Sequence, residues 1–103
     1  MTRLIRNVID GQPVDALSGQ AIDLVDPTTG QVFAEAAVSG PQDVDAAYAA
    51  ASRAFESWRE TTPSQRQAAL LGLADLLEAH GDELVALESE NTGKPLAVTA
   101  AEE

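Results

Sequence analysis

The stretch VFAEAAVSGPQDVDAA, residues 32–47, decides the fold class, because the spacing of its apolar residues changes at Ser39. Before Ser39 the apolar side chains follow the period of two that is typical of a strand, and after it they follow the period of 3.6 of a helix. We expect Ser39 to cap this helix, Gln42 to complete a capping box and Pro41 to occupy the first turn. The stretch therefore predicts a strand followed by a helix over about residues 41–59.

Upstream, residues 7–38 are typical of two short β-ribbons. Asp10-Gly11 lies between two short apolar runs, and an Asp-Gly pair favours a tight hairpin because both central residues must accept positive φ. Farther along, Asp26–Gly30 contains a proline that presets φ for a turn and a glycine that can adopt a left-handed conformation. We therefore expect a second hairpin, closed by this turn.

One apolar stripe runs along the first predicted helix, opposite Asp45, Arg53 and Glu56. Its aromatic members are expected to pack in the core rather than to stack on a ligand, and we expect Trp58 to be buried against the second helix. The stripe consists of Val44, Ala47, Tyr48, Ala51, Phe55 and Trp58.

A second helix is predicted over residues 63–80, with Thr62 as its cap and Gln65 closing a capping box. We expect His80 to lie at its negative end and Gly81 to stop it in a left-handed conformation. Capping is favoured over catalysis for His80, because local spacing places no second titratable partner beside it. The apolar stripe of this helix consists of Ala69, Leu70, Leu73, Leu76 and Leu77.

A third helix is predicted over residues 82–92, capped by Asp82 and ended by Gly93. Pro95 then opens a fourth helix at Leu96, which has no stop signal before the sequence ends.

Composition excludes several classes of function. The chain has 103 residues with 17 acidic and 6 basic side chains, a net charge of -11, and this charge repels nucleic acid and anionic membranes. No apolar run is long enough for a membrane span or a secretory signal, which predicts a cytoplasmic protein. The absence of cysteine excludes disulfides and a thiol nucleophile on this chain, and a single histidine excludes a multi-histidine metal site.

Polar motifs in the chain offer no catalytic group on physical grounds. Gly93-Lys94-Pro95 lacks the first glycine and the Ser or Thr of a phosphate-binding loop. Paired carboxylates could serve in acid-base or metal chemistry, but helix N-termini and solvated faces explain them better. These pairs are Asp43/Asp45, Asp82/Glu83, Glu88/Glu90 and Glu102/Glu103.

The order of several short motifs resembles the N-terminal region of NAD-dependent aldehyde dehydrogenases, over nearly the whole chain. The sequence of residues 88–95 and the Thr-Thr-Pro segment before the second helix are most similar to those of the gamma-aminobutyraldehyde and betaine-aldehyde dehydrogenases. The motifs are Asn7–Gly11, Asp26–Gly30, Asp43–Ala47, Ala54–Trp58, Arg66, Leu73–Asp75 and Glu88–Pro95.

This resemblance implies a reaction whose groups lie outside the chain. In the family a cysteine attacks the aldehyde, hydride passes to NAD, and a glutamate activates water to hydrolyse the thioester. All of these groups, and the NAD-binding fold, belong to regions beyond Glu103, so no catalytic or cofactor-binding residue is assigned here. We expect the 103-residue chain alone to be inactive.

The resemblance also implies one site within the chain, which binds a monovalent cation, K⁺ or Na⁺. Its ligands fall on the main-chain carbonyls of Leu24 and Val25 and on the side chain of Asn91. Asn91 replaces the aspartate of the family, so it keeps an oxygen ligand and loses the charge. The alternative is that Asn91 caps a helix end near Gly93.

We therefore predict an α/β segment of aldehyde dehydrogenase type, with two β-hairpin ribbons, three helices and the start of a fourth. Residues 1–38 would form the ribbon part and residues 39–103 the helical part. Its partners would be the rest of its own enzyme and the subunits of a homo-oligomer. The rival hypothesis is a free-standing, acidic, non-catalytic helical module that binds a partner through its alanine-rich stripes.

Overall fold

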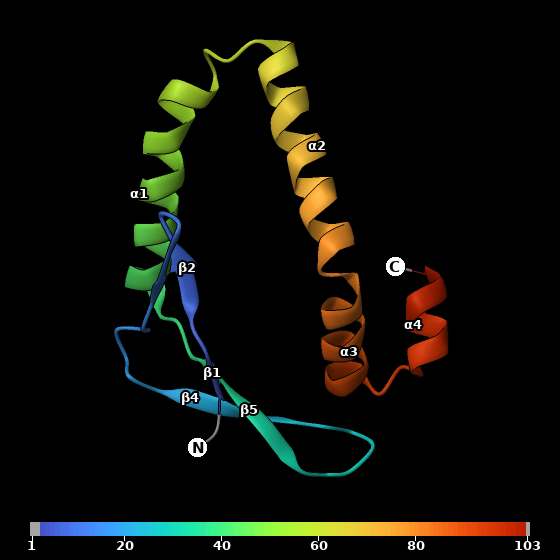
Figure 1. The fold of residues 1–103 in the computed structure, drawn as a ribbon. Coiled ribbons are helices and arrows are strands. Elements are labelled where there is room, and N and C mark those ends of the chain that lie inside the picture. The colour runs from blue at the N-terminus through green and yellow to red at the C-terminus, as the bar shows by residue number, and fades with distance from the viewer. Residues whose placement is uncertain (1–2, 103) are drawn as a thin grey trace. The chain divides into compact units, whose positions relative to one another are not determined.

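The computed structural model describes residues 3–102, which form five short strands followed by four helices (Figure 1). The strands are β1 (Arg3–Ile5), β2 (Asn7–Ile9), β3 (Gln12–Val14), β4 (Ala21–Val25) and β5 (Val32–Ala37). The helices are α1 (Pro41–Trp58), α2 (Pro63–Ala79), α3 (Gly81–Thr92) and α4 (Leu96–Glu102). This confirms the predicted α/β class, with each of the three complete helices within about one residue of its expected bounds.

The chain divides into two compact units. The first combines Met1–Val25 with Val32–Glu60, and the second combines Asp26–Gln31 with Thr61–Glu103. The change from strand to helix falls between Ala37 and Pro41, where the ribbon and helical parts were expected to meet. The two compact units are divided differently from these two parts. α1 belongs to the unit with the strands, and the loop between β4 and β5 belongs to the unit with α2, α3 and α4.

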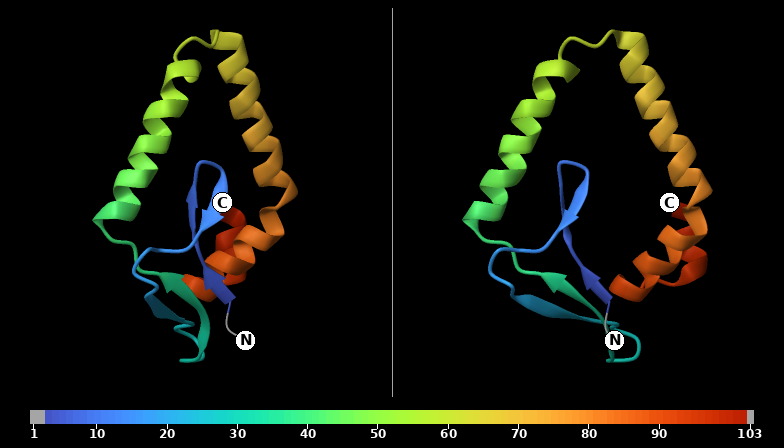
Figure 2. Two further views of the ribbon diagram at one scale, coloured as in Figure 1. Left: turned by 90° about the vertical axis from the view of Figure 1, so that its left-hand side faces the viewer. Right: turned by 60° about the vertical axis from the view of Figure 1, so that its left-hand side comes forward.

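Both predicted hairpins form, and all four of their strands lie in the first unit. β2 and β3 are antiparallel and are joined by Asp10 and Gly11, whose φ values of 56° and 72° are those of the tight turn that the Asp-Gly pair favours. β4 and β5 are also antiparallel (Figure 2). Their register shifts between Leu24 and Val25. No residue pattern indicated β1, which pairs in parallel with β5 and places β5 in the centre of a three-stranded sheet.

Buried side chains in the described part of the first unit are few and small. Ala34 of the central strand is fully buried, and Ala50 of α1 and Ala16 of the loop before β4 are nearly so. β2 lies against α1, and the Asp10 carboxylate lies 3.8 Å from the Arg53 guanidinium at this contact. Small side chains let the hairpin approach α1 closely but bury little apolar area.

The start of α1 corrects the predicted cap. Gly40, not Ser39, is the N-cap, and the Asp43 carboxylate takes the place expected for Gln42 by accepting from the Gly40 amide at 2.8 Å. Ser39 instead donates its hydroxyl to Asn7 Oδ1. Because Pro41 occupies the first helical position, the third position falls on Asp43, and its charge suits the positive end of the helix.

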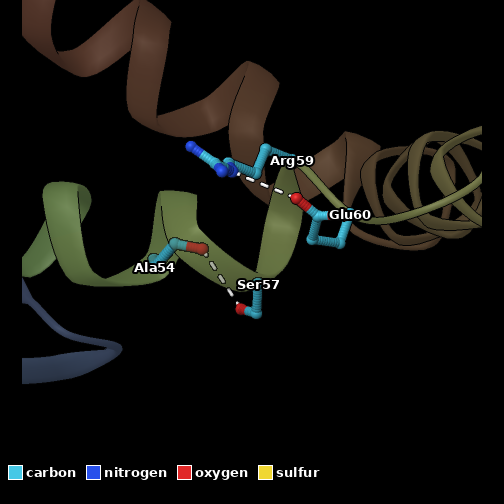
Figure 3. Close-up of polar contacts among 4 residues, drawn as sticks. All are labelled: Ala54, Ser57, Arg59 and Glu60. Carbon is cyan, nitrogen blue, oxygen red and sulfur yellow. Dashed lines mark hydrogen bonds and ion pairs between the residues drawn. The ribbon is translucent and has the colours of Figure 1, made fainter.

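Figure 3 shows polar contacts at the end of α1, each between residues that are close in the sequence. Ser57 donates its hydroxyl to the Ala54 carbonyl at 3.2 Å, and the Arg59 Nε donates to Glu60 Oε1 at 3.1 Å. Between them Trp58 is 45% exposed, so its predicted burial is wrong for this chain. Helical spacing shows which face of a helix is apolar, but it does not show whether another element covers that face.

The junction of α2 and α3 corrects a second cap. His80 is the C-cap of α2, as expected, but α3 begins at once with Gly81, which has no positive φ. The predicted left-handed stop at Gly81 and the predicted cap at Asp82 are therefore wrong. A single non-helical residue, His80 with φ -109° and ψ 14°, changes the direction of the chain between the two helices. The junction therefore needs neither a left-handed glycine nor a separate cap at Asp82.

Candidate functional site

The residues predicted to bind a monovalent cation lie in both compact units. Leu24 and Val25 end β4 in the first unit, where the register shift interrupts the regular ladder with β5. Asn91 lies in the last turn of α3 in the second unit, and its side chain is exposed. The structure describes each unit by itself, so shared coordination of one cation by these three residues stays a prediction.

Other residues than Asn91 build the cap at the end of α3. Gly93 adopts φ 76° and donates its amide to the Ser89 carbonyl at 2.9 Å, as a left-handed cap does. The Ser89 hydroxyl donates to the Lys94 carbonyl at 2.7 Å, and the Thr92 hydroxyl donates to the Glu88 carbonyl at 2.8 Å. The predicted end of the third helix at Gly93 is confirmed, and the cap does not need the Asn91 side chain.

The Asp26–Gly30 turn is held by the carboxylate of its first residue. Asp26 Oδ1 accepts from the Thr28 amide at 2.7 Å and from the Thr28 hydroxyl at 2.6 Å. These hydrogen bonds favour the charged form and lower the pKa of Asp26 below 3.8. The turn is closed by the Gly30 amide, which donates to the Asp26 carbonyl, and by the Asp26 amide, which donates to Gln31.

This turn packs directly on the end of α3. A β-carbon built on Gly93 would lie 2.9 Å from Pro27 Cγ and 3.6 Å from Thr28 Cγ2, so the proline ring occupies the space that a side chain would need. A hollow of about 370 Å³ lies in the same unit and is lined by Asp26, Thr28, Ala86, Leu87, Ser89, Glu90 and Leu96. Sequence reasoning missed this contact, because residues 27 and 93 are far apart in the chain.

The acidic pairs do not gather into a metal centre. Among residues 3–102, no group of three or more histidine or acidic side chains has a geometry that could hold a metal ion. Asp82 and Glu83 lie in the first turn of α3, the favourable place expected for them. Glu103 lies outside the described residues. His80 Nδ1 lies 3.3 Å from Glu83 Oε2, an exposed contact that the sequence reasoning did not anticipate.

Asp43 lies in the first turn of α1, the helix N-terminus expected for the acidic pairs, but it is buried rather than solvated. It is 5% exposed, and its two oxygens accept from separate backbone amides, Oδ1 from Leu17 at 3.1 Å and Oδ2 from Gly40 at 2.8 Å. Asp43 therefore joins the loop before β4 to the start of α1. The signal that could have revealed this cap is the Gly-Pro pair ahead of it, which sets the helix register.

None of the helices within residues 3–102 has the length and apolar character needed to cross a membrane.

Comparison with known proteins gives a consistent result. The model of the aldehyde dehydrogenase family matches residues 14–103. The aminoacetaldehyde dehydrogenase of Pseudomonas aeruginosa is 46% identical over 93 residues, which is 88% of this chain and 19% of that enzyme. This chain therefore spans about one fifth of the length of that relative.

Solved structures agree in fold. The gamma-glutamyl-gamma-aminobutyraldehyde dehydrogenase of Burkholderia cenocepacia superposes with a TM-score of 0.90 at 43% identity, over 94% of this chain and 20% of that one. PnpE, in a complex with nicotinamide adenine dinucleotide, superposes with a TM-score of 0.89 at 40% identity, over 99% of this chain and 20% of that one. With the family model covering most of its length, the chain belongs to the aldehyde dehydrogenase family.

Proposed function

We propose that the chain is the N-terminal segment of an enzyme that oxidises an aldehyde to the carboxylic acid with NAD. The observation that carries this proposal is the family match over residues 14–103, together with the aminoaldehyde enzymes among the relatives. An aminoaldehyde is therefore the substrate class we propose. The segment supplies structure rather than chemistry, because the sequence has no cysteine to serve as the nucleophile.

NAD does not fit the residues of this chain. Binding of a dinucleotide in a parallel α/β fold uses a glycine-rich turn between a strand and a helix, and the sequence holds no such motif. We therefore assign no catalytic step and no cofactor contact to residues of this chain. NAD would be held by other parts of the complete enzyme.

A large exposed apolar face supports a role as one part of a larger assembly. Five leucines of α2 are between 51% and 64% exposed: Leu70, Leu71, Leu73, Leu76 and Leu77. On α1, Tyr48 is 72% and Phe55 is 55% exposed. Soluble monomers rarely leave so many large apolar side chains uncovered on neighbouring turns. We propose that the remainder of the enzyme, in a homo-oligomer, covers these faces.

Activity measurements test the main proposal. The complete protein should form NADH from NAD when it is given a gamma-aminoaldehyde, and the 103-residue chain should form none under the same conditions. Benzaldehyde and NADP serve as the comparison substrate and cofactor. Aldehyde-dependent NADH formation by the pure 103-residue chain, or none by the complete protein with any aldehyde, would contradict the proposal. Reading the DNA after codon 103 gives an independent check, because an in-frame cysteine-containing continuation is expected.

We also propose that Leu24, Val25 and Asn91 bind K⁺ or Na⁺. The register shift at Leu24 and Val25 supports this proposal, because a break in the ladder can turn main-chain carbonyls away from their strand partner. Asn91→Asp adds the charge that the family carries, so it should raise thermal stabilisation by KCl over that by choline chloride. An equal response of both variants to K⁺, Na⁺ and choline would contradict this site.

A cytoplasmic location stays a prediction, which cell fractionation can check.

The rival hypothesis of a free-standing interaction module predicts different solution behaviour. Such a module should be a compact, cooperative monomer at every salt concentration. A segment with uncovered leucines should instead self-associate, and more so as salt screens its charge. Sedimentation of the 103-residue chain distinguishes the two.

A further inference from the structure

We infer that the β4–β5 loop, residues 26–31, acts as a strap that holds the turn between α3 and α4 closed. Both strands that the loop connects belong to the first compact unit, yet the loop itself belongs to the second, with the helices. Its contacts are therefore made mainly with the helical unit rather than with the sheet from which it emerges. The strap would act on the described residues 89–102.

The loop is braced internally, as a strap must be. The Asp26 carboxylate accepts from both the amide and the hydroxyl of Thr28, and the Gln31 amide donates to the Thr29 hydroxyl at 3.2 Å. The Gly30 amide donates to the Asp26 carbonyl at 2.8 Å. These bonds fix the direction of Pro27, the residue that reaches the helical unit.

The seat of the strap is a glycine. Pro27 Cγ lies 2.9 Å from the position that a β-carbon on Gly93 would take, and Thr28 Cγ2 lies beside it at an ordinary contact distance of 3.6 Å. Gly93 is the first residue of the turn that leads to α4, and the Ser89 hydroxyl secures the next residue, Lys94, by its carbonyl. The proline ring thus packs directly on Gly93, the one residue of the turn that has no side chain.

The segment beyond this seat depends on outside contacts for its order. α4 has 7 described residues, and isolated helices shorter than about 12–15 residues are marginal in water. Its buried residue, Thr99, donates both its hydroxyl and its amide to the Pro95 carbonyl, so these bonds stay within the first turn of the helix and begin at the residue that ends the turn. If the turn opens, α4 loses the position from which it packs on α3 (Figures 1 and 2).

Hydrogen–deuterium exchange of the complete protein tests the strap. Pro27→Ala removes the ring carbons that meet Gly93, and Thr28→Val removes the hydroxyl hydrogen bond to Asp26 Oδ1 while keeping the side-chain shape and the amide hydrogen bond. Both variants should speed exchange over residues 93–102 by about three- to tenfold, the factor expected when one local contact or hydrogen bond is lost. Pro41→Ala, at the start of α1, is the matched control and should leave that segment unchanged.

Amides of the hairpin 7–14 report whether each variant is folded, because this hairpin lies in the other unit. If Pro27→Ala disturbs the hairpin as well, the milder Thr28→Val decides the question. Unchanged exchange over residues 93–102 in a folded Thr28→Val or Pro27→Ala variant would overturn the strap. Equal acceleration by Pro41→Ala would overturn it too.

Discussion

Substitution of Gly93 by alanine combines two separate costs. The residue has φ 76°, and a left-handed conformation costs an L-residue about 1–2 kcal/mol. The new β-carbon would also lie 2.9 Å from Pro27 Cγ, well inside the distance of about 3.5 Å at which carbon atoms pack. Such overpacking typically adds about 1–3 kcal/mol. We therefore expect Gly93→Ala to lower the free energy of unfolding by about 2–5 kcal/mol.

Two other glycines separate these costs. Gly30 has φ 71° with open space around its β-carbon position, so Gly30→Ala should cost only the conformational part, about 1–2 kcal/mol. Gly72 lies inside α2 with open space and no positive φ, so Gly72→Ala should stabilise the protein by about 1 kcal/mol. The three variants should therefore fall in a fixed order of stability.

Urea denaturation followed by circular dichroism measures the three free energies of unfolding. A double-mutant cycle then tests the contact itself, because Pro27→Ala should reduce the cost of Gly93→Ala toward that of Gly30→Ala. If Gly93→Ala and Gly30→Ala cost the same, and Pro27→Ala does not change the cost of Gly93→Ala, the close approach of the proline to Gly93 is refuted. If Gly93→Ala is neutral, the left-handed cap is refuted as well.

Four further predictions follow from the described contacts. Asp43→Ala should lower the urea midpoint by an amount equivalent to about 2–3 kcal/mol, because it leaves two backbone amides without their charged acceptor; an unchanged midpoint would contradict this. The Thr28 hydrogen bonds lower the pKa of Asp26, so their stabilisation is complete above the unfolded value of 3.8 and is lost as pH falls through the folded value. Acid titrations should then show a smaller loss of stability for Asp26→Asn than for the wild type. Trp58→Ala should cost about 3–5 kcal/mol in the complete enzyme if its exposed face is covered there, and clearly less in the 103-residue chain, where Trp58 is 45% exposed; calorimetry of both forms checks this. Sedimentation of the 103-residue chain should show self-association that increases with salt, because a net charge of -11 opposes it at low salt; a monomer throughout would favour the rival module.

Local chemistry made much of the secondary structure predictable from the sequence. The tight β2–β3 turn follows from Asp10-Gly11, since few other residue pairs accept positive φ at both positions. Thr62 and Gln65 form the expected capping box of α2, with the Gln65 amide donating to the Thr62 hydroxyl and the Thr62 amide donating to the Gln65 side chain. Both features depend on residues within three positions of each other.

Features that depend on distant parts of the chain could not be predicted in this way. β1 carries no turn signal and pairs in parallel with β5, about thirty residues away, so only the folded backbone reveals it. The burial of Asp43 depends on the Leu17 amide, which the sequence does not place beside it. For the cation site, the sequence shows only that Leu24, Val25 and Asn91 resemble the ligands of the family. The geometry of that site stays a prediction.

The sequence by itself determined where the two hairpins and the helices lie to within a residue or two, because turns, caps and periodicity are set by the φ preferences and hydrogen bonds of neighbouring residues. Tertiary structure alone decided which of these elements touch. The packing of Pro27 on Gly93 shows why: each residue follows a local rule, a turn proline and a left-handed cap, and neither rule contains the other residue. Contacts of that kind arise only when the chain closes a long loop, and local preferences carry no information about that closure.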